Sequence, residues 1–382
     1  MRDTLFDIAI IGGGMAGASV AANLASHARV IVLERESQPG YHATGRSAAL
    51  FSEIYGSASI RTLTRASREF LHTPPRGFVD TPLVSPRGAL YIANAEQLGE
   101  LDGFAALPDV AAGTIRVGAI EARAKSPMLQ EGYVAAALFE QNAMDLDVHA
   151  LHQGYLRLLR QQGGRLKNDA GVIALERRGE AWEITTSTGV FHAKAVINAA
   201  GAWVDEIAKL ASATPIGIQP LRRTAFMVDS PVGSDSDQWP MTVDIDEQFY
   251  IKPDAGRLLL SPADETPSPP CDALPEEMDI AIAVDRIERA TTLSINRVQQ
   301  KWAGLRSFVP DRNPVVGYDP EIPEFFWLAA LGGYGIQTAP AMGRLAAALF
   351  LRNALPDDLL ALELDPFTIS PERLASVVST HA

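Results

Sequence analysis

The chain has 382 residues, of which 47% are hydrophobic and 21% charged, an ordinary balance for a globular protein of two domains. Its formal net charge of −13 comes without a long run of Lys or Arg, so nucleic-acid binding is not expected. A single cysteine, Cys271, excludes an internal disulfide framework and fits a cytoplasmic protein.

The chain begins with the pattern of a βαβ unit. Residues 6–11 have the continuous apolar character of a buried parallel strand, and residues 15–25 follow with helical spacing. Residues 30–33 then form a second short apolar run. The first run is too short for a signal peptide or a membrane span, so we expect at most peripheral membrane association.

The remaining periodic segments predict alternating helices and strands. Helices are expected at residues 61–73, 147–163 and 339–351, and strands at 87–92, 165–174, 181–186, 191–199, 248–252 and 325–331. The strands from 165 to 199 are expected to return to the first sheet, which makes the nucleotide domain discontinuous.

A glycine-rich motif stands between the first strand and the first helix. Gly12, Gly14 and Gly17 satisfy the pattern G-x-G-x-x-G in the strand-to-helix context that gives it meaning. Gly12 permits the tight turn, Gly14 lets the backbone approach a pyrophosphate, and Gly17 allows close packing of helix on strand. The positive end of the helix dipole favours the phosphates.

An acidic residue closes the second strand. Glu34 lies where a carboxylate can accept hydrogen bonds from the ribose hydroxyls of an adenosine, and it disfavours a 2′-phosphate. The motif alone leaves FAD and NAD open. The small and hydroxyl-bearing residues at 40–49 suit an extended dinucleotide, and the turn at 198–203 would touch the same cofactor from another side.

These segments resemble the D-amino-acid oxidase and glycine oxidase superfamily of flavoproteins, and further runs resemble bacterial D-arginine dehydrogenases. The runs are Leu-Glu-Arg-Glu at 33–36, Gln-Pro-Gly-Tyr-His at 38–42, Thr-Gly-Arg-Ser-Ala-Ala at 44–49, Leu-His-Gln-Gly-Tyr-Leu at 151–156, Trp-Ala-Gly-Leu-Arg-Ser-Phe at 302–308 and Gly-Gly-Tyr-Gly-Ile-Gln-Thr at 332–338. The resemblance extends along nearly the whole chain.

The resemblance implies an α/β fold with two domains. A discontinuous Rossmann-type FAD-binding domain is expected at residues 1–80, 145–215 and 300–382. A second, α+β substrate domain on a mixed or antiparallel sheet is expected at residues 81–144 and 216–299.

The resemblance also implies which residues bind FAD. They are Gly12, Gly14, Ala16, Gly17, Glu34, Arg35, Thr44, Arg46, Ser47, Ala48, Ala49, Val172, Ala200, Gly201, Gly333, Tyr334, Gly335, Ile336, Gln337 and Thr338. His42 matches the noncovalent dehydrogenases, so non-covalent FAD is expected. The helix that follows residues 332–335 would direct its positive end at the flavin, where negative charge develops on reduction.

A carboxylate substrate calls for arginine, whose planar guanidinium binds carboxylates in a bidentate manner. Arg223 and Arg306 match the carboxylate-binding arginines of the similar dehydrogenases, and Tyr55 and Tyr250 match their pocket tyrosines. Taken alone, each arginine would more often form a structural ion pair. The resemblance completes the substrate pocket with Leu50, Ser52, Ala89, Gly333 and Gln337.

Two departures from the D-arginine enzymes concern the substrate side chain. Leu50 stands where those enzymes have a histidine, and Ala89 stands where they have the glutamate that receives the guanidinium. Because an unpaired guanidinium in such a pocket costs on the order of several kcal/mol, we expect a less charged side chain than that of arginine.

The resemblance implies a D-amino-acid dehydrogenase of amino-acid catabolism. Hydride transfer to flavin N5 would give an imino acid, which hydrolyses to a 2-oxo acid, and a quinone or another acceptor would take the electrons. One alternative is an oxidase of glycine or of a secondary amino acid on the same fold. Another is a non-catalytic FAD-binding protein. No metal site is expected, because His149 and His152 have no suitable third ligand nearby.

Overall fold

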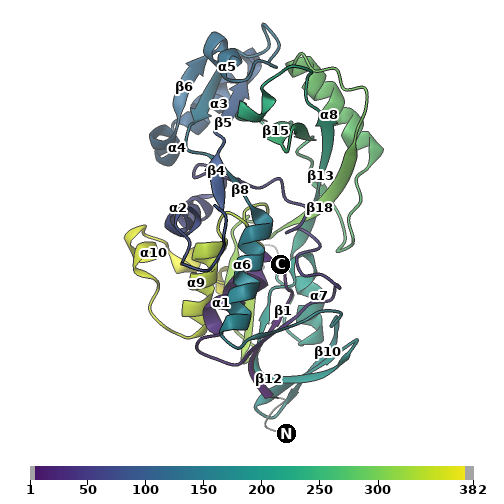
Figure 1. Cartoon of the computed structure of the whole chain (residues 1–382). Helices are drawn as coiled ribbons and strands as arrows, with labels where there is room; N and C mark the ends of the chain where they lie inside the picture. The colour runs from purple at the N-terminus through teal and green to yellow at the C-terminus, as the bar shows by residue number, and fades with distance from the viewer. Residues whose placement is uncertain (1–4, 375–382) are drawn as a thin grey trace, which may run out of the picture.

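The computed structural model describes residues 5–374 and has an α/β fold with two large sheets at opposite ends of the molecule (Figure 1). One sheet is eight-stranded and contains the N-terminal βαβ unit, and the other is nine-stranded. A small third sheet pairs β3 (Leu50–Phe51) and β4 (Val84–Pro86) with β8 (Met144–Leu146).

Parallel strands form the centre of the eight-stranded sheet. In order they are β9 (Arg165–Lys167), β2 (Val30–Leu33), β1 (Leu5–Ile11), β12 (Gly189–Asn198) and β20 (Phe325–Ala329). Antiparallel strands extend it: β10 (Val172–Arg178), β11 (Ala181–Thr186) and β19 (Val315–Tyr318). Ile11 pairs with both Leu33 and Asn198, so the carboxyl ends of three parallel strands align.

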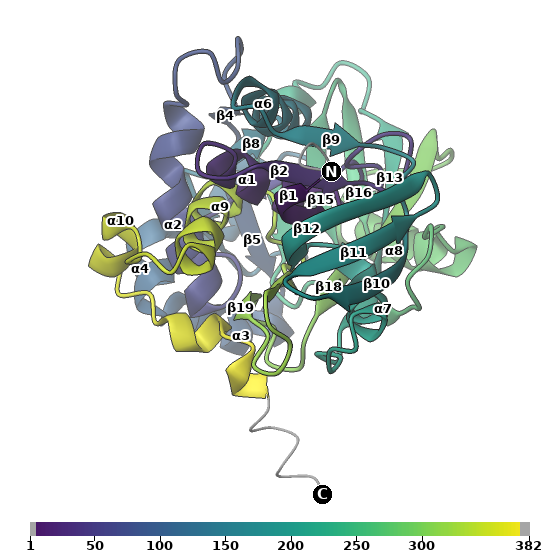
Figure 2. The ribbon, with the colours of Figure 1, turned by 90° about the horizontal axis from the view of Figure 1, so that it is seen from below.

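Helices cover the faces of this sheet, as Figure 2 shows from below. They are α1 (Met15–Leu24), α2 (Ala58–His72), α6 (Val148–Gln161), α7 (Val204–Leu210), α9 (Ala339–Phe350) and α10 (Asp357–Ala361). Strand β1 serves both cores, because successive side chains of a strand point to opposite faces. Ile8 and Ile10 pack in the core that includes α1 and α9, whereas Ala9 and Ile11 pack in the core that includes α7.

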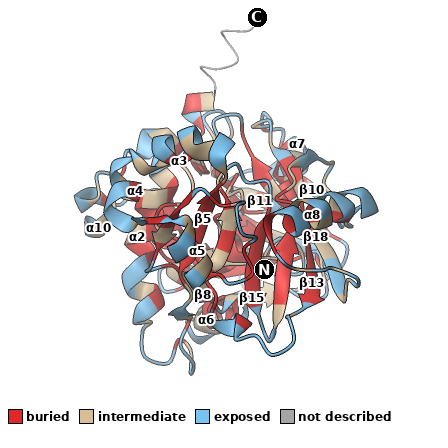
Figure 3. Cartoon of the chain, turned by 90° about the horizontal axis from the view of Figure 1, so that it is seen from above, coloured by how far each residue is buried: buried red, intermediate tan, exposed pale blue. Residues whose placement is uncertain are grey.

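The nine-stranded sheet is mixed, because β14 and β5 pair in parallel and its other neighbours are antiparallel. Its strands are β5 (Ala89–Ala93), β6 (Ile115–Gly118), β7 (Ala136–Glu140), β13 (Gln219–Asp229), β14 (Met241–Asp244), β15 (Tyr250–Asp254), β16 (Arg257–Ser261), β17 (Thr266–Pro267) and β18 (Gln300–Phe308). The associated helices are α3 (Leu98–Ala105), α4 (Pro108–Gly113), α5 (Ala119–Lys125) and α8 (Glu277–Ala290). Figure 3 shows buried strands beneath exposed helix faces.

Several expected elements differ from the structure. The single strand expected at 165–174 is wrong: it is divided into β9 and β10, and Asp169 between them has a left-handed φ of 55°. Helix α2 begins three residues earlier than the expected residue 61, because Ser57 accepts a hydrogen bond from Ile60 N and caps it. The 14-residue helix α8 was not predicted.

The domain limits stay a prediction. Strand β18, at residues 300–308, begins the segment assigned to the FAD-binding domain, but it pairs with β13 in the nine-stranded sheet. Between residues 5 and 374, no helix is long and apolar enough to cross a bilayer.

Candidate active site

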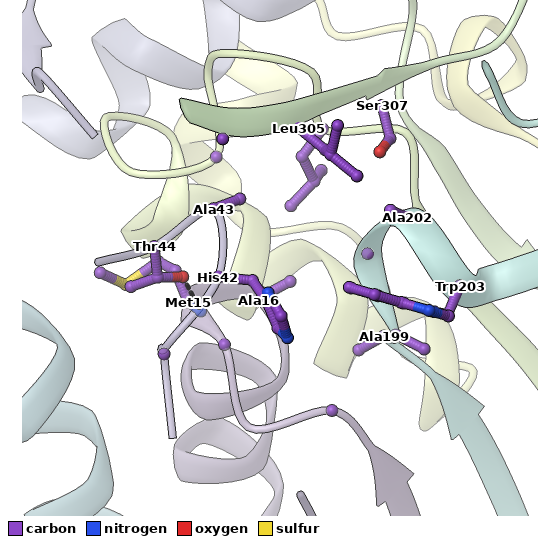
Figure 4. Close-up of a pocket in the computed structure, with 18 of the residues that line it drawn as sticks. Met15, Ala16, His42, Ala43, Thr44, Ala199, Ala202, Trp203, Leu305 and Ser307 are labelled. Carbon is purple, nitrogen blue, oxygen red and sulfur yellow. Dashed lines mark hydrogen bonds between the residues drawn. The ribbon is translucent and has the colours of Figure 1, made fainter. Parts of the chain in front are cut away.

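A cavity of about 520 Å³ lies at the carboxyl ends of the parallel strands, where Ile11, Leu33 and Ala329 line it. This edge of an open α/β sheet is where such folds bind ligands. Figure 4 shows side chains around this space from the glycine loop, the 42–44 segment, the turn at 199–203 and β18. The cavity thus joins segments that are far apart in the sequence.

The glycine loop is packed so closely that side chains are excluded. A Cβ on Gly17 would lie 1.9 Å from the carbonyl oxygen of Gly12. Gly12 has a φ of +105°, and a Cβ there would lie 2.5 Å from the carbonyl oxygen of Ala199. Gly12 and Gly14 line the cavity, whereas Gly17 lies beneath the loop. The loop therefore presents backbone to the cavity, as pyrophosphate binding requires.

Glu34 fixes the loop as well as facing the cavity. Its Oε2 accepts a hydrogen bond from Gly13 N at 2.7 Å, and its Oε1 accepts one from Glu36 N at 2.9 Å. The residue is only 7% exposed yet lines the cavity. Each carboxylate oxygen can accept a second hydrogen bond, so capacity remains for ribose hydroxyls.

The segment after β2 forms another wall of the cavity. Thr44 Oγ1 accepts a hydrogen bond from Met15 N at 3.0 Å, at the start of α1 (Figure 4). The Arg46 guanidinium donates to the carbonyl oxygens of Ala273 and Ala303, both at 2.9 Å, and it pairs with Asp272. Arg46 therefore ties this segment to the nine-stranded sheet.

Most of the predicted cofactor residues line the cavity. Those that do are Gly12, Gly14, Ala16, Glu34, Arg35, Thr44, Arg46, Ser47, Ala48, Val172, Ala200, Gly201, Gly333, Gly335 and Ile336. Gly17, Ala49, Tyr334, Gln337 and Thr338 are not in its wall. Roles in cofactor binding stay a prediction for all of them.

Arg306, one of the two arginines predicted to bind a carboxylate, meets the turn at residues 332–336 at the far end of the cavity. Arg306 lies against Gly333, where an added Cβ would be 2.8 Å from the guanidinium. Its Nη1 donates to the Tyr55 hydroxyl at 3.2 Å. Burial opposes the charged form, but neighbouring Tyr55, Tyr250 and Glu247 raise the pKa of Arg306 above its ordinary value. Arg306 is therefore a cation in the cavity wall.

Arg223, the other arginine predicted to bind a carboxylate, already has hydrogen-bond partners within the protein. Arg223 is 6% exposed and donates to the carbonyl oxygen of Asp264 at 2.8 Å and to Glu265 Oε1 at 3.2 Å. Glu265 also accepts two hydrogen bonds from Arg312, at 2.7 and 3.0 Å. Burial works against ionisation, but the arginines lower the pKa of Glu265. Arg223 and Tyr250 both line the cavity.

Apart from Gly333, the other predicted substrate residues do not line the cavity: Leu50, Ser52, Tyr55, Ala89 and Gln337. Gln337 is 3% exposed; its Oε1 accepts from Ser52 N at 3.2 Å, and its Nε2 donates to Thr64 Oγ1 at 3.0 Å. Leu50 packs against the apolar cluster that contains Ala89. Their substrate contacts stay a prediction.

Sequence reasoning missed several residues at this site. His152 is 4% exposed, and its Nε2 lies 2.8 Å from the Gly13 carbonyl oxygen, so it supports the glycine loop from α6. Trp203 lines the cavity between the His42 ring, at a centroid distance of 4.7 Å, and the Arg35 guanidinium, at 4.8 Å. Cys271 also lines it. The helix pattern around His152 left a packing or a surface role open and could not give its distant partner, Gly13.

Comparisons with known proteins agree on one family. The profile described as FAD dependent oxidoreductase (DAO) matches residues 7–349. Glycine oxidase of Geobacillus kaustophilus is 24% identical, over 96% of this chain and 97% of that protein. Its crystal structure superposes with a TM-score of 0.78 at 23% identity, covering 92% of this chain and 96% of that one.

A second solved structure gives the same fold. L-Proline dehydrogenase from P. horikoshii superposes with a TM-score of 0.79 at 21% identity, covering 92% of this chain and 95% of that chain. Since the family profile spans most of the sequence, the chain belongs to the FAD dependent oxidoreductase (DAO) family, and its cofactor is FAD.

Proposed function

We propose that this protein dehydrogenates D-amino acids to imino acids. The observation that carries the proposal is Arg306, a cation in the cavity wall that makes no ion pair with a carboxylate among residues 5–374. A cation without a carboxylate in a partly buried site is costly unless a ligand supplies one. The α-carboxylate of an amino acid is such a ligand.

The residues present fit FAD. The cavity extends from Glu34, which can bind a ribose, past the glycine loop, which has no room for side chains, to Gly333 and Arg306. Gly12, Gly14, Glu34, Thr44 and the backbone around Gly333 would hold it, and the absence of a covalent bond through His42 stays a prediction. When bound, FAD supplies the two-electron acceptor for the Cα–H bond of the substrate.

The protein groups would bind and orient the substrate. Arg306 would form the carboxylate contact, and Tyr55, which accepts a hydrogen bond from Arg306, would keep its own proton for the substrate. Arg223 would stay in its ion pair with Glu265 and contribute positive electrostatic potential to the cavity. With substrate bound as the neutral amine, positioning would supply most of the rate, and no strong protein base would be needed.

An apolar or weakly polar substrate side chain is part of the proposal. Ala89 is fully buried in a cluster with Ile54 and Tyr91, and Leu50 packs against the same cluster. These neighbours provide no carboxylate at position 89, and Glu140, the cross-strand partner of Ala89, already accepts hydrogen bonds from Ser52 Oγ and Glu53 N. We therefore propose greater turnover of D-Leu, D-Met and D-Phe than of D-Arg, with a quinone or another acceptor taking the electrons in the cytoplasm.

Oxidation of glycine or of a secondary amine is a second candidate. Relatives named glycine oxidase are 23% and 24% identical to this chain, and one structural neighbour is described as iminodiacetate oxidase, with a TM-score of 0.79. These substrates also carry a carboxylate for Arg306, so the carboxylate site alone does not separate the two candidates.

Anaerobic bleaching of the flavin tests the proposal. The yellow protein is mixed with D- and L-amino acids, glycine, sarcosine and proline, and the absorbance of oxidised flavin is followed. Fast bleaching by apolar D-amino acids supports the proposal, whereas bleaching by glycine or sarcosine alone overturns it in favour of the second candidate. A preference for D-Arg contradicts the side-chain assignment. Bleaching by no amine overturns both candidates, and hydrogen peroxide formation in air separates oxidase from dehydrogenase.

A further inference from the structure

Glu140, the last residue of β7, is a buried carboxyl group outside the cavity wall. It is 2% exposed, and it pairs in register with Ala89 on the neighbouring strand β5. Cross-strand partners share one face of a sheet, so Glu140 lies beside the position expected at the side-chain end of the substrate pocket. It makes no ion pair within residues 5–374.

Two hydrogen bonds join Glu140 to the segment at residues 52–55. Ser52 Oγ donates to Glu140 Oε2 at 2.7 Å, and Glu53 N donates to Oε1 at 2.9 Å. The Tyr91 hydroxyl lies 3.2 Å from Ser52 Oγ. A single carboxyl group thus engages a side chain and the adjacent backbone of a segment that has little secondary structure of its own.

A second buried charged side chain holds the same part of the chain. Lys252 on β15 is 6% exposed and donates to the carbonyl oxygens of Ala48 and Ala49, at 3.2 and 3.1 Å. The nine-stranded sheet therefore binds residues 48–53 at both ends, through Lys252 at one and Glu140 at the other. The same segment leads directly to Tyr55, which accepts the hydrogen bond from Arg306.

We propose that Glu140 is a positioning residue that, through Ser52 and Glu53, holds Tyr55 in place against Arg306. The proposal rests on the carboxylate site proposed above, since it assigns Glu140 to the support of that site. Glu140 does not touch the reacting groups. In its neutral form Glu140 keeps Oε1 as the acceptor for Glu53 N and donates from Oε2 to Ser52 Oγ, which holds the segment closed; its ionised form favours opening of the segment to solvent.

The direction of this effect follows from the burial of the carboxyl group. Burial raises the pKa of Glu140 to about 7, although the hydrogen bonds from Ser52 and Glu53 oppose the rise. An opened segment exposes the carboxyl group to water, where its pKa returns toward the ordinary value of about 4.5. Because a raised carboxyl pKa stabilises the closed state only while the group is neutral, rising pH through this window favours opening.

Tyr91 and Glu53 are titratable groups that face Glu140. Burial raises the pKa of Tyr91 well above its ordinary value, so that phenol stays neutral. Glu53 forms an ion pair with Arg68 of α2. Other charged groups on elements packed against β7 are Glu100 and Asp102 of α3, Arg116 of β6, and Glu121, Arg123 and Lys125 of α5. Arg116 pairs with Asp102 at the surface, and Lys125 lies over Phe139, whose side chain alternates to the opposite face.

The test compares Glu140→Gln with Glu53→Gln in the FAD-loaded protein. Glutamine keeps the size of Glu140 and its acceptor for Glu53 N but cannot ionise. Glu53→Gln removes the neighbouring carboxylate, which forms an ion pair with Arg68, and keeps the backbone donor to Glu140. The first readout is hydrogen exchange of the peptide that contains residues 50–56, corrected for the intrinsic pH dependence.

In the wild type and in Glu53→Gln, opening is expected to increase by up to about two orders of magnitude between pH 5 and pH 8. In Glu140→Gln it is expected to remain unchanged. The second readout is steady-state kinetics with a D-amino acid: the ratio of wild-type to Glu140→Gln KM should rise over the same range, whereas the kcat ratio stays constant, since opening affects carboxylate capture.

Equal pH dependence of exchange in the wild type and Glu140→Gln overturns the proposal, as does a pH-dependent kcat ratio with an unchanged KM ratio. Failure of the proposed function is a different result. If no amino acid bleaches the wild-type flavin, the kinetic readout is lost, but the exchange experiment still decides whether Glu140 holds the segment.

Discussion

The two ends of the cavity are built from different chemical groups. At the glycine-loop end, the wall includes closely packed backbone and the Glu34 carboxylate, and a Cβ at Gly12 or Gly17 would collide with carbonyl oxygens. At the opposite end, the side chains of Arg306 and Tyr250 line the cavity, and Tyr55 accepts a hydrogen bond from Arg306 behind them; the three come from segments far apart in the sequence. The first end depends on close packing of backbone and is the predicted dinucleotide end, whereas the second depends on side chains whose exchange we expect to alter the substrate.

The largest effect is expected at the glycine-loop end. The Cβ in Gly17→Ala would lie 1.9 Å from the Gly12 carbonyl oxygen, so the loop must move away from its position. We expect a cost of at least about 3 kcal/mol and loss of bound FAD, measured by Tm and by the flavin absorbance of the purified protein. Gly99→Ala is the control, because nothing lies within 4 Å of its Cβ. Retention of FAD by Gly17→Ala would contradict the tight packing.

At the substrate end, we expect a substitution to lower kcat/KM without loss of FAD. Arg306→Met should lower kcat/KM by about two to three orders of magnitude, because it removes the proposed carboxylate contact, while FAD stays bound. Arg306→Lys should lose less, since it keeps the charge without the planar fork. Arg178→Met, at an exposed ion pair on β10, serves as the control. Unchanged kcat/KM in Arg306→Met would remove the main support for an amino-acid substrate.

A smaller effect on the cofactor is expected from Glu34→Gln. The change replaces the carboxylate that accepts hydrogen bonds from Gly13 N and Glu36 N. One of these two N–H donors then faces the NH₂ group of the glutamine, which cannot accept a hydrogen bond. We expect FAD binding to weaken about tenfold, with little change in KM, as measured by fluorescence titration of the apoprotein. Glu100→Gln on the exposed face of α3 is the comparison. If Glu34→Gln changed KM but not FAD binding, the two ends of the cavity would not have the separate cofactor and substrate roles that we expect.

The smallest effect concerns the support of the glycine loop by His152. Burial lowers the pKa of His152, although its hydrogen bond to the Gly13 carbonyl opposes this, so the folded state disfavours the imidazolium form. The wild type should therefore lose stability as pH falls below about 6.5, where the unfolded state binds the proton. His152→Gln should lack this loss and differ by less than about 1 kcal/mol at pH 8. The exposed His149→Gln should behave as the wild type in pH-dependent urea unfolding.

Local signals predicted the cofactor end of the molecule well. The strand, glycine and helix pattern at residues 6–25 predicted β1 and α1, and the structure adds that Glu34, predicted to bind a ribose, accepts a hydrogen bond from Gly13 N of the loop. Strands β1, β2 and β20 were predictable because they are apolar runs with clear boundaries, whereas β9, with the sequence Arg-Leu-Lys, was merged with β10. Strands such as β13 and β18 were not predicted, because their pairing spans about eighty residues and leaves no local pattern.

At the substrate end, the sequence predicted which residues matter but not their ion-pair or hydrogen-bond partners. Arg223 and Arg306 look equivalent because the resemblance matches both to carboxylate-binding arginines, but Glu265 pairs with Arg223 and no carboxylate pairs with Arg306 among the described residues. Gln337 was expected to contact flavin or substrate, whereas its amide is hydrogen-bonded to Ser52 and Thr64. These differences arise from contacts between residues 42 to 285 positions apart.

The sequence by itself determined the α/β class, the strand, glycine loop and helix at the start of the chain and the acid that closes β2, because each depends on residues close together in the chain, where backbone sterics and periodicity act. Only the tertiary structure decided which arginine has a carboxylate partner among the described residues and which acid, Glu140, is hydrogen-bonded to the segment that leads to Tyr55. Charge pairing and burial are long-range properties: a side chain's partner and its access to water are set by the packing of distant elements, which no local pattern records.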